Sequence, residues 1–168
     1  MVGESVMGDT HLVAVCGLYC GACSIYRATR DGNQQKLEDF ARGLTARTGK
    51  NFSVDDVRCD GCLGKGQLDL WCRNCRIRVC EKLQSGRIRC SDCDEFPCTR
   101  LTDFRDDGMK HHKEITENLE HLQKMGIDAW TEHEEKRWSC PECKAVLSWY
   151  DSSCPGCNPP RSKDLFSL

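Results

Sequence analysis

Residues 59–98 read CDGCLGKGQLDLWCRNCRIRVCEKLQSGRIRCSDCDEFPC, and this stretch places eight cysteines within forty residues. The cysteines form three C-x2-C pairs and two lone thiols. The second and third pairs are each followed by a further cysteine after four residues, which gives a short internal repeat of Cys72, Cys75 and Cys80, then Cys90, Cys93 and Cys98. The two residues between paired cysteines form a tight turn that directs both sulfurs to one point, about 2.3 Å from a shared zinc ion. The stretch therefore predicts clustered metal sites.

The composition of the whole chain supports the same prediction. It has 15 cysteines among 168 residues, with only 7% aromatic and 30% charged residues, so we expect metal coordination to replace part of a hydrophobic core. The opening MVGESVMGDTHLVAVCGLYC has no basic region followed by an apolar run, which predicts neither a signal peptide nor a membrane anchor. We therefore expect a cytoplasmic protein whose thiols stay reduced, and the odd cysteine count also argues against complete disulfide pairing.

Helical periodicity is clearest between the cysteines. Residues 33–48 carry one apolar stripe, made by Leu37, Phe40, Ala41 and Leu44, and Gly49 is a suitable stop. Further helices are expected over 24–30, 99–108, 109–125 and 127–137, with Glu132, Glu134, Glu135 and Lys136 of the last one in solvent. A single capped turn is expected from Ser53 to Asp56.

These segments predict a small metal-stabilised fold that is mainly α with little β. We expect a flexible tail at 1–10, a cysteine-rich helical zinc domain at 11–108, a helical connector at 109–137, a zinc ribbon at 138–158 and a disordered tail at 159–168.

The ribbon prediction depends on the sequence CPECKAVLSWYDSSCPGC. Its four cysteines, Cys140, Cys143, Cys154 and Cys157, have the spacing C-x2-C-x10-C-x2-C, and residues 146–150 between the pairs are strand-forming. Two such pairs supply the four sulfurs of a tetrahedral zinc site, so we interpret the segment as a zinc ribbon.

A third kind of spacing occurs in CGLYCGAC, where Cys16, Cys20 and Cys23 follow C-x3-C-x2-C. This is also the spacing of the cluster-binding loop in radical S-adenosylmethionine enzymes. Those enzymes need a large strand-helix barrel, and no alternating strand-helix pattern follows here. Ala22 also stands where their loop usually has an aromatic residue. Structural zinc is therefore the favoured interpretation.

Counting ligands predicts about four zinc ions. All cysteines are candidate ligands: Cys16, Cys20, Cys23, Cys59, Cys62, Cys72, Cys75, Cys80, Cys90, Cys93, Cys98, Cys140, Cys143, Cys154 and Cys157. With the ribbon complete, eleven cysteines remain, enough for two four-sulfur sites and three further thiols. A zinc ion held by three thiolates readily accepts an imidazole as its fourth ligand. His111 is the first candidate, because it lies on the predicted apolar stripe of 109–125 with His112 at its edge, and His11 is the second.

Basic residues gather between Cys72 and Cys90, namely Arg73, Arg76, Arg78, Lys82, Arg87 and Arg89. They could bind nucleic acid, but they could equally balance the negative charge of thiolate-zinc centres. We favour the second interpretation, because no aromatic stacking residues alternate with the arginines.

The ordered set CGLYCGAC, CDGCL, WCRNCRIRVC, CSDCDEFPC, LTDFRDDGMKHHKEITENL and CPECKAVLSWYDSSCPGC resembles a small prokaryotic cysteine-rich family of unknown function that is suspected of binding zinc. The resemblance covers residues 12–158. It implies that Cys16, Cys20, Cys23 and the eight cysteines of 59–98 act as one set.

Three functional hypotheses follow. The first is a structural-zinc module without an active centre, which binds or regulates another protein. It is favoured because the sequence contains no serine-histidine-aspartate set, phosphate-binding loop or paired-carboxylate motif. The second is an iron-sulfur or redox protein, since thiolates bind both metals. The third is a nucleic-acid-binding zinc-ribbon protein.

Overall fold

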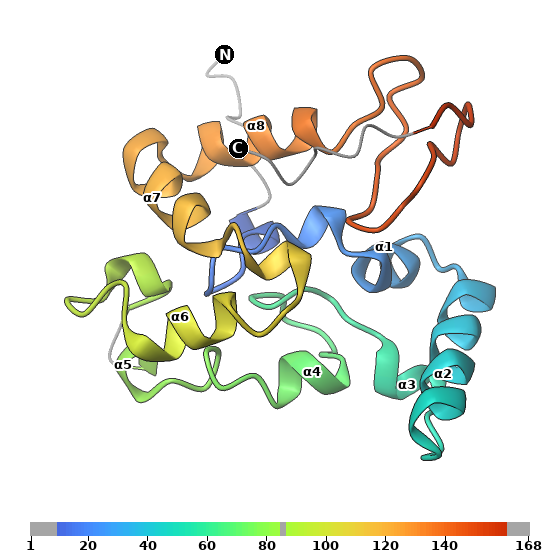
Figure 1. The fold of residues 1–168 in the computed structure, drawn as a ribbon, viewed down its shortest axis with the longest axis horizontal. Helices are drawn as coiled ribbons and strands as arrows, with labels where there is room; N and C mark the ends of the chain where they lie inside the picture. Colours follow the sequence, from blue (N-terminus) through green and yellow to red (C-terminus); the bar gives the residue numbers. More distant parts are fainter. Residues whose placement is uncertain (1–9, 85–86, 161–168) are drawn as a thin grey trace, which may run out of the picture.

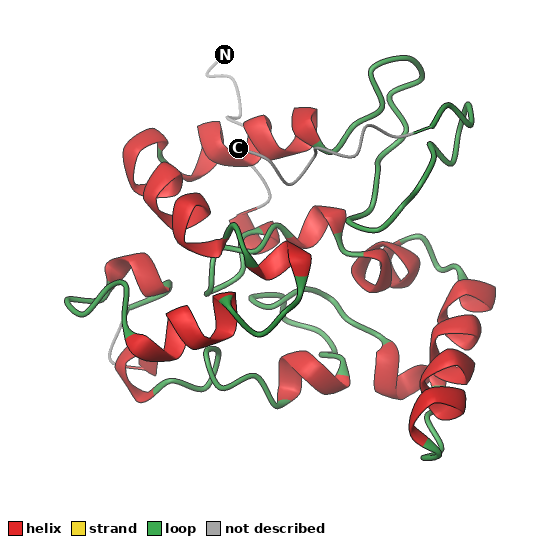
Figure 2. Ribbon diagram, in the orientation of Figure 1, coloured by secondary structure: helices red, strands yellow, loops and turns green. Residues whose placement is uncertain are grey.

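The computed structural model describes residues 10–84 and 87–160, and this part of the chain folds mainly into short helices joined by loops (Figures 1 and 2). The first half contains the turns η1 (Thr10–Leu12) and η2 (Cys20–Ala22), followed by α1 (Ser24–Arg30), α2 (Gln34–Thr48), α3 (Val54–Val57), α4 (Leu70–Arg73) and α5 (Glu81–Gln84). The second half contains η3 (Cys90–Asp92), α6 (Thr99–Arg105), η4 (Lys110–His112), α7 (Ile115–Met125) and α8 (Ile127–Arg137). The mainly helical prediction is confirmed. The predicted terminal tails fall almost entirely outside the described residues.

Helices α1, α2 and α3 enclose a small apolar cluster of their own. The predicted stripe of α2 faces inward, with Leu37 fully buried against Ala28 and Val57. The helix begins where the Asn33 side chain accepts the Lys36 backbone N–H at 3.0 Å, and it ends at Gly49, whose φ of 70° suits glycine. The predicted capped turn is also present, because Asp56 accepts the backbone N–H of Ser53 at 2.9 Å.

A larger core surrounds the N-terminal segment 12–22, which runs through the middle of the molecule in Figure 1. Ile115 and Leu119 of α7 and Trp130 of α8 are almost fully buried in it. The same core includes Leu101 of α6 and Trp138 beyond α8. Apolar residues from 12 to 154 thus share one core, although the predicted domain boundaries themselves stay predictions.

Two helix predictions need correction. The helix predicted over 109–125 begins only at Ile115, because Asp107 accepts the Met109 N–H at 3.0 Å and residues 110–112 form a separate turn. In that turn His112 is the buried histidine and binds the Asp107 carboxylate at 2.9 Å, while His111 is more exposed. Glu134 is not in solvent but 2% exposed.

The prediction of strand structure at 146–150 is also wrong. The described residues contain no strand, and their isolated bridges join Val13 with Tyr19, Ser139 with Val146 and Ser153 with Pro160. Leu147 donates to the carbonyl of Trp138 at 2.7 Å beside the Ser139–Val146 bridge, but the next residues do not continue this pairing. Trp149 donates to the carbonyl of Ala22 at 3.0 Å, and Ser148 donates to the side chain of Asp151 at 2.7 Å. This segment therefore attaches the C-terminal loops to the N-terminal segment instead of pairing as a strand.

No helix in the described ranges combines the length and the apolar character needed to cross a membrane.

Candidate metal centres

The four C-terminal cysteines converge. The sulfurs of Cys140, Cys143, Cys154 and Cys157 all lie within 4.8 Å of one another, and we call them the C-terminal thiol group. Two of the separations are 3.6 Å (Cys140 to Cys157) and 3.4 Å (Cys143 to Cys154). Four sulfurs around one tetrahedral zinc ion lie about 3.8 Å apart, given a zinc-sulfur distance of about 2.3 Å. The group could hold a metal ion with little rearrangement.

Both cysteine pairs of this group have the same backbone conformation. In each pair, the residue after the second cysteine has a positive φ, 60° at Lys144 and 62° at Asn158. Each of these residues donates its N–H to the carbonyl of the first cysteine of its pair, over 3.0 Å. The Gly156 N–H also points at the sulfur of Cys154, over 3.3 Å. N–H groups of Cys157 and Gly156 lower the pKa of Cys154 to about 6, which favours the thiolate that binds metals.

A second group combines two cysteines with a carboxylate. The sulfurs of Cys59 and Cys72 are 4.0 Å apart, and a carboxylate oxygen of Asp69 lies within 4.8 Å of both. Asp69 is 5% exposed, and it is fixed by accepting the Cys72 N–H at 2.7 Å as the N-cap of α4. Aspartate oxygen is an accepted zinc ligand. Sequence reasoning missed Asp69, and its position three residues before Cys72 was the available signal.

Five more cysteines do not join this tight cluster but belong to the larger core, with Cys16, Cys20 and Cys62 buried in it and Cys23 and Cys75 packed against it. Burial raises the pKa of Cys23 to about 12, and the negative charges of a Cys59 thiolate and of Asp69 add to this effect. The charge of Cys59 also adds to the burial that raises the pKa of Cys20. Burial also raises the pKa of Cys16, with added repulsion from Cys62. We call the seven thiols the central thiol group: Cys16, Cys20, Cys23, Cys59, Cys62, Cys72 and Cys75.

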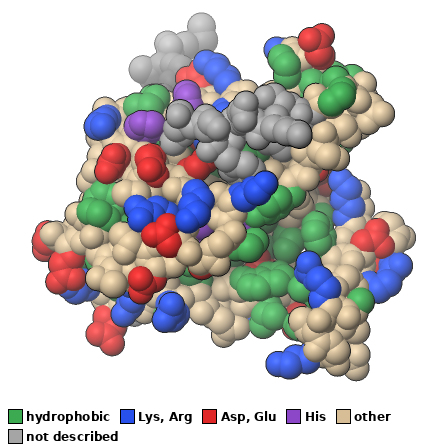
Figure 3. All heavy atoms as spheres, in the orientation of Figure 1, with side chains coloured by type: hydrophobic (Ala, Val, Ile, Leu, Met, Phe, Trp, Pro, Cys, Tyr) green, Lys and Arg blue, Asp and Glu red, His purple; other side chains and the backbone are tan. Residues whose placement is uncertain are grey.

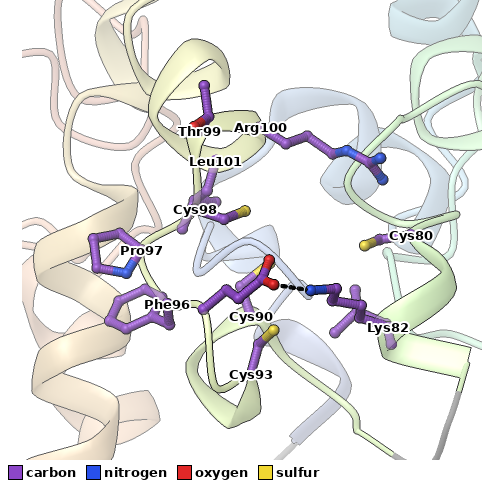
Figure 4. A pocket seen from close by; sticks show the side chains of 12 residues that line it. Cys80, Lys82, Cys90, Cys93, Phe96, Pro97, Cys98, Thr99, Arg100 and Leu101 are labelled. Carbon is purple, nitrogen blue, oxygen red and sulfur yellow. Dashed lines mark ion pairs between the residues drawn. The ribbon is translucent and has the colours of Figure 1, made fainter.

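The remaining four cysteines line a cavity of about 400 Å³ (Figure 4). Cys80 precedes α5, whereas the other three lie in the segment that runs from the start of η3 to the residue before α6. We call Cys80, Cys90, Cys93 and Cys98 the cysteine pocket. Within the described chain they form no set of three ligand atoms inside 4.8 Å, unlike the C-terminal thiol group. Burial raises the pKa of Cys90 to about 12, and the charges of Cys98, Cys80 and Cys93 add to this effect.

The histidines predicted as fourth ligands have other partners. His111 Nδ1 lies 2.7 Å from the Tyr150 hydroxyl, and its ring stacks on Trp149 with ring centres 4.2 Å apart. His11 Nε2 lies 3.1 Å from the hydroxyl of Tyr26. Within the described part of the chain, neither histidine joins a group of three or more candidate ligands.

The basic residues of 72–90 do not stand alone. The Arg78 guanidinium donates to the carbonyl of Cys62 at 3.1 Å. Three others pair with carboxylates outside this range, Arg73 with Asp56, Lys82 with Glu95 and Arg87 with Asp94. On the face shown in Figure 3, basic and acidic side chains are interspersed. These partners are carboxylates and a backbone carbonyl, so both the predicted balancing of thiolate-zinc charge and the unfavoured nucleic-acid binding stay predictions.

Short helices that enclose clustered thiols, including one group of four able to hold a metal ion, define a cysteine-rich helical protein with candidate metal sites. Residues 12–103 match the family DUF3795, described as a protein of unknown function, and the chain belongs to this family. The match includes the central thiol group and the cysteine pocket but not the C-terminal thiol group. No curated protein and no solved structure matches the chain.

Proposed function

We propose that this protein binds zinc as a structural metal and serves as an interaction or regulatory module in the cytoplasm. The observation that carries this proposal is the geometry of the C-terminal thiol group, whose sulfurs are spaced as a four-thiolate zinc site requires. Zinc at such closed sites contributes folding energy and leaves no open position for a substrate.

We further propose that the central thiol group binds two zinc ions. Its seven sulfurs and the Asp69 carboxylate make eight ligands, which is the number that two four-coordinate zinc ions use. In this proposal Asp69 takes the role that the sequence suggested for a histidine. Its fixed position beside Cys59 and Cys72 supports Asp69, rather than a histidine, as the ligand that is not a cysteine.

The partner in this proposal is another protein. The cysteine-rich segment exposes three large apolar side chains that do not contribute to the core: Trp71, Val79 and Ile88, which are 49%, 48% and 56% exposed. Such residues suit a protein interface better than a nucleic-acid interface, where positive charge dominates.

Metal analysis of the full chain, purified without oxygen, tests the zinc proposal. We expect three zinc ions per chain, one in the C-terminal thiol group and two in the central thiol group. Replacing Cys154 with Ala should remove one zinc ion and leave two. A chain that folds with its cysteines alkylatable and without bound zinc would contradict the proposal.

Stability gives a second, independent readout. Because thiolate coordination replaces apolar burial around residues 59–98, removal of zinc by a strong chelator should abolish cooperative unfolding of this region. Unchanged thermal unfolding after complete metal removal would show that packing alone holds the fold together.

A further inference from the structure

The cysteine pocket differs from the C-terminal thiol group in being open. In the C-terminal thiol group the four sulfurs lie together, whereas in the cysteine pocket they face a shared space of about 400 Å³ from different sides (Figure 4). A single zinc ion would require the four sulfurs to approach to about 3.8 Å of one another. The pocket would have to close around such an ion.

The geometry points to an iron-sulfur cluster in this pocket, bound by Cys80, Cys90, Cys93 and Cys98. In a [4Fe–4S] cluster each cysteine binds a different iron atom at a corner of the cube, so the four sulfurs must lie well apart around a volume that the cluster fills. This inference goes beyond the proposed function, since it assigns a different inorganic group to one of the four sites.

The backbone holds three of these cysteines around the space. The N–H of Cys93 donates to the carbonyl of Cys90 at 3.1 Å, which forms the turn of the C-x2-C pair. The N–H of Phe96 donates to the carbonyl of Cys93 at 3.1 Å and turns the chain again before Cys98. The Cys90 N–H donates to the carbonyl of Val15 at 2.9 Å, which anchors the pair to the central segment. Cys80 faces them from the other side of the space (Figure 4).

The other walls of the pocket suit an anionic cluster. Leu83, Phe96, Pro97 and the fully buried Leu101 provide apolar surface, which limits contact between water and the cluster. Lys82 and Arg100 provide positive charge, and Lys82 also pairs with Glu95 at the same pocket (Figure 4). A cluster with four thiolate ligands carries net negative charge, and because Glu95 offsets Lys82, Arg100 leaves the lining with one net positive charge that stabilises it.

All four cysteines are only partly buried. One side of a bound cluster would therefore be open to small molecules, so the cluster should be lost in air. In the C-terminal thiol group Cys140 and Cys154 are buried and Cys143 and Cys157 are exposed, so the difference between the sites comes from the metal, because zinc is not redox-active. Exposure to oxygen should thus separate the two kinds of site.

Reconstitution of the full chain without oxygen, using iron, sulfide and a thiol reductant, tests the inference. We expect four iron and four sulfide ions per chain, a brown colour, and an electron paramagnetic resonance signal after reduction with dithionite. Cys93→Ala should lose the iron and sulfide while keeping zinc in the C-terminal thiol group. Cys154→Ala is the matched control, and it should lose one zinc ion but keep the cluster.

Alkylation mapping avoids the need for a folded variant. In the reconstituted wild-type chain, the four pocket cysteines should resist iodoacetamide and become reactive after exposure to air, while the C-terminal cysteines stay protected. A fourth zinc ion protecting the pocket cysteines, with no iron or sulfide retained, would overturn the inference and leave the zinc proposal intact. Retention of the cluster in Cys93→Ala together with Cys98→Ala would overturn the ligand assignment.

Discussion

The side-chain amide of Asn118 donates a hydrogen bond to the carbonyl of Gly17 over 3.0 Å, although 101 residues separate the two. Asn118 lies on α7 and is 3% exposed, and Gly17 lies in the loop between Cys16 and Cys20. The hydrogen bond satisfies a carbonyl that is buried beneath α7. Helix α7 therefore helps to shape the loop that presents the first cysteines of the central thiol group.

Gly17 is fixed by its conformation and by the close approach of α7. Its φ is 88°, and a Cβ atom there would lie 2.7 Å from both the Ile115 carbonyl oxygen and Leu119 Cγ. Gly17→Ala should therefore displace α7 from the loop and reduce the free energy of unfolding by about 3 kcal/mol or more, since strain adds to a steric clash.

Gly32→Ala is the matched control for this prediction. Gly32 also has a positive φ, of 62°, but a Cβ atom there would meet no atom within 4 Å. Gly32→Ala should therefore lower the free energy of unfolding only by the backbone strain, about 1–2 kcal/mol. Equal losses for the two variants in urea unfolding would show that α7 does not constrain the loop.

Gly156 tests the C-terminal thiol group in the same way. A Cβ atom at this position would lie 2.8 Å from the sulfur of Cys143 and 3.0 Å from Ala145 Cβ. Gly156→Ala should push Cys143 out of position and speed the loss of one zinc ion to a chromogenic chelator by tenfold or more, because changes in residues that position metal ligands commonly cost that much affinity. Gly43→Ala, where a Cβ atom meets nothing within 4 Å, should leave the release rate unchanged. Identical release rates in Gly156→Ala and Gly43→Ala would show that Cys143 does not bind the metal ion.

The local features of the fold could be predicted from the sequence, whereas its long-range contacts could not. The stripe of α2 and the stop at Gly49 depend on residues that are neighbours along one helix. The spacing of the C-terminal cysteines likewise predicted their convergence. Metal ligation by these residues stays a prediction.

Partner choice among the other cysteines needed the structure. The repeat gives 72–80 and 90–98 the same cysteine spacing, yet Cys72 lies beside Cys59 while the corresponding Cys90 lines the cysteine pocket. The two halves of the repeat are equal in spacing but lie in different surroundings. Glu134 was predicted in solvent because charged residues usually are, and its contacts with Arg137 and with the Trp138 indole N–H explain its burial.

Asp69 offers a test that separates a metal ligand from a helix cap. Asn is as good an N-cap as Asp, so Asp69→Asn should keep α4 but lose a charged zinc ligand. We expect native mass spectrometry to show weaker retention of one zinc ion in this variant, with the helical circular dichroism signal unchanged when zinc is in excess. Asp69→Ala should lose both the ligand and the cap. Full zinc retention in Asp69→Asn would limit Asp69 to capping.

Arg137 should control how the stability of the helical part depends on pH. Its guanidinium lies between two buried carboxylates, Glu114 and Glu134, and the Trp138 indole N–H also donates to Glu134 at 3.0 Å. Burial raises the pKa of Glu114, while the neighbouring Arg137 opposes that rise. A carboxyl group with a raised pKa binds its proton more tightly in the folded state, so stability falls as pH increases from its ordinary pKa to its folded pKa.

Arg137→Met removes the opposing charge and should raise the folded pKa of Glu114 further. We expect a loss of about 3–5 kcal/mol at pH 8, because both carboxylates then stay buried without their cation. Part of this loss should be recovered as pH is lowered to 6, since Glu114 becomes protonated more easily in the folded protein. Arg42→Met is the matched control, because Arg42 pairs with Asp39 at the same i,i+3 spacing but in solvent. Urea unfolding of both variants at each pH gives the difference between their losses of unfolding free energy. Any effect of pH on metal binding that the two variants share cancels in this difference. A difference that stays constant from pH 6 to 8 would mean that Glu114 does not titrate in this range.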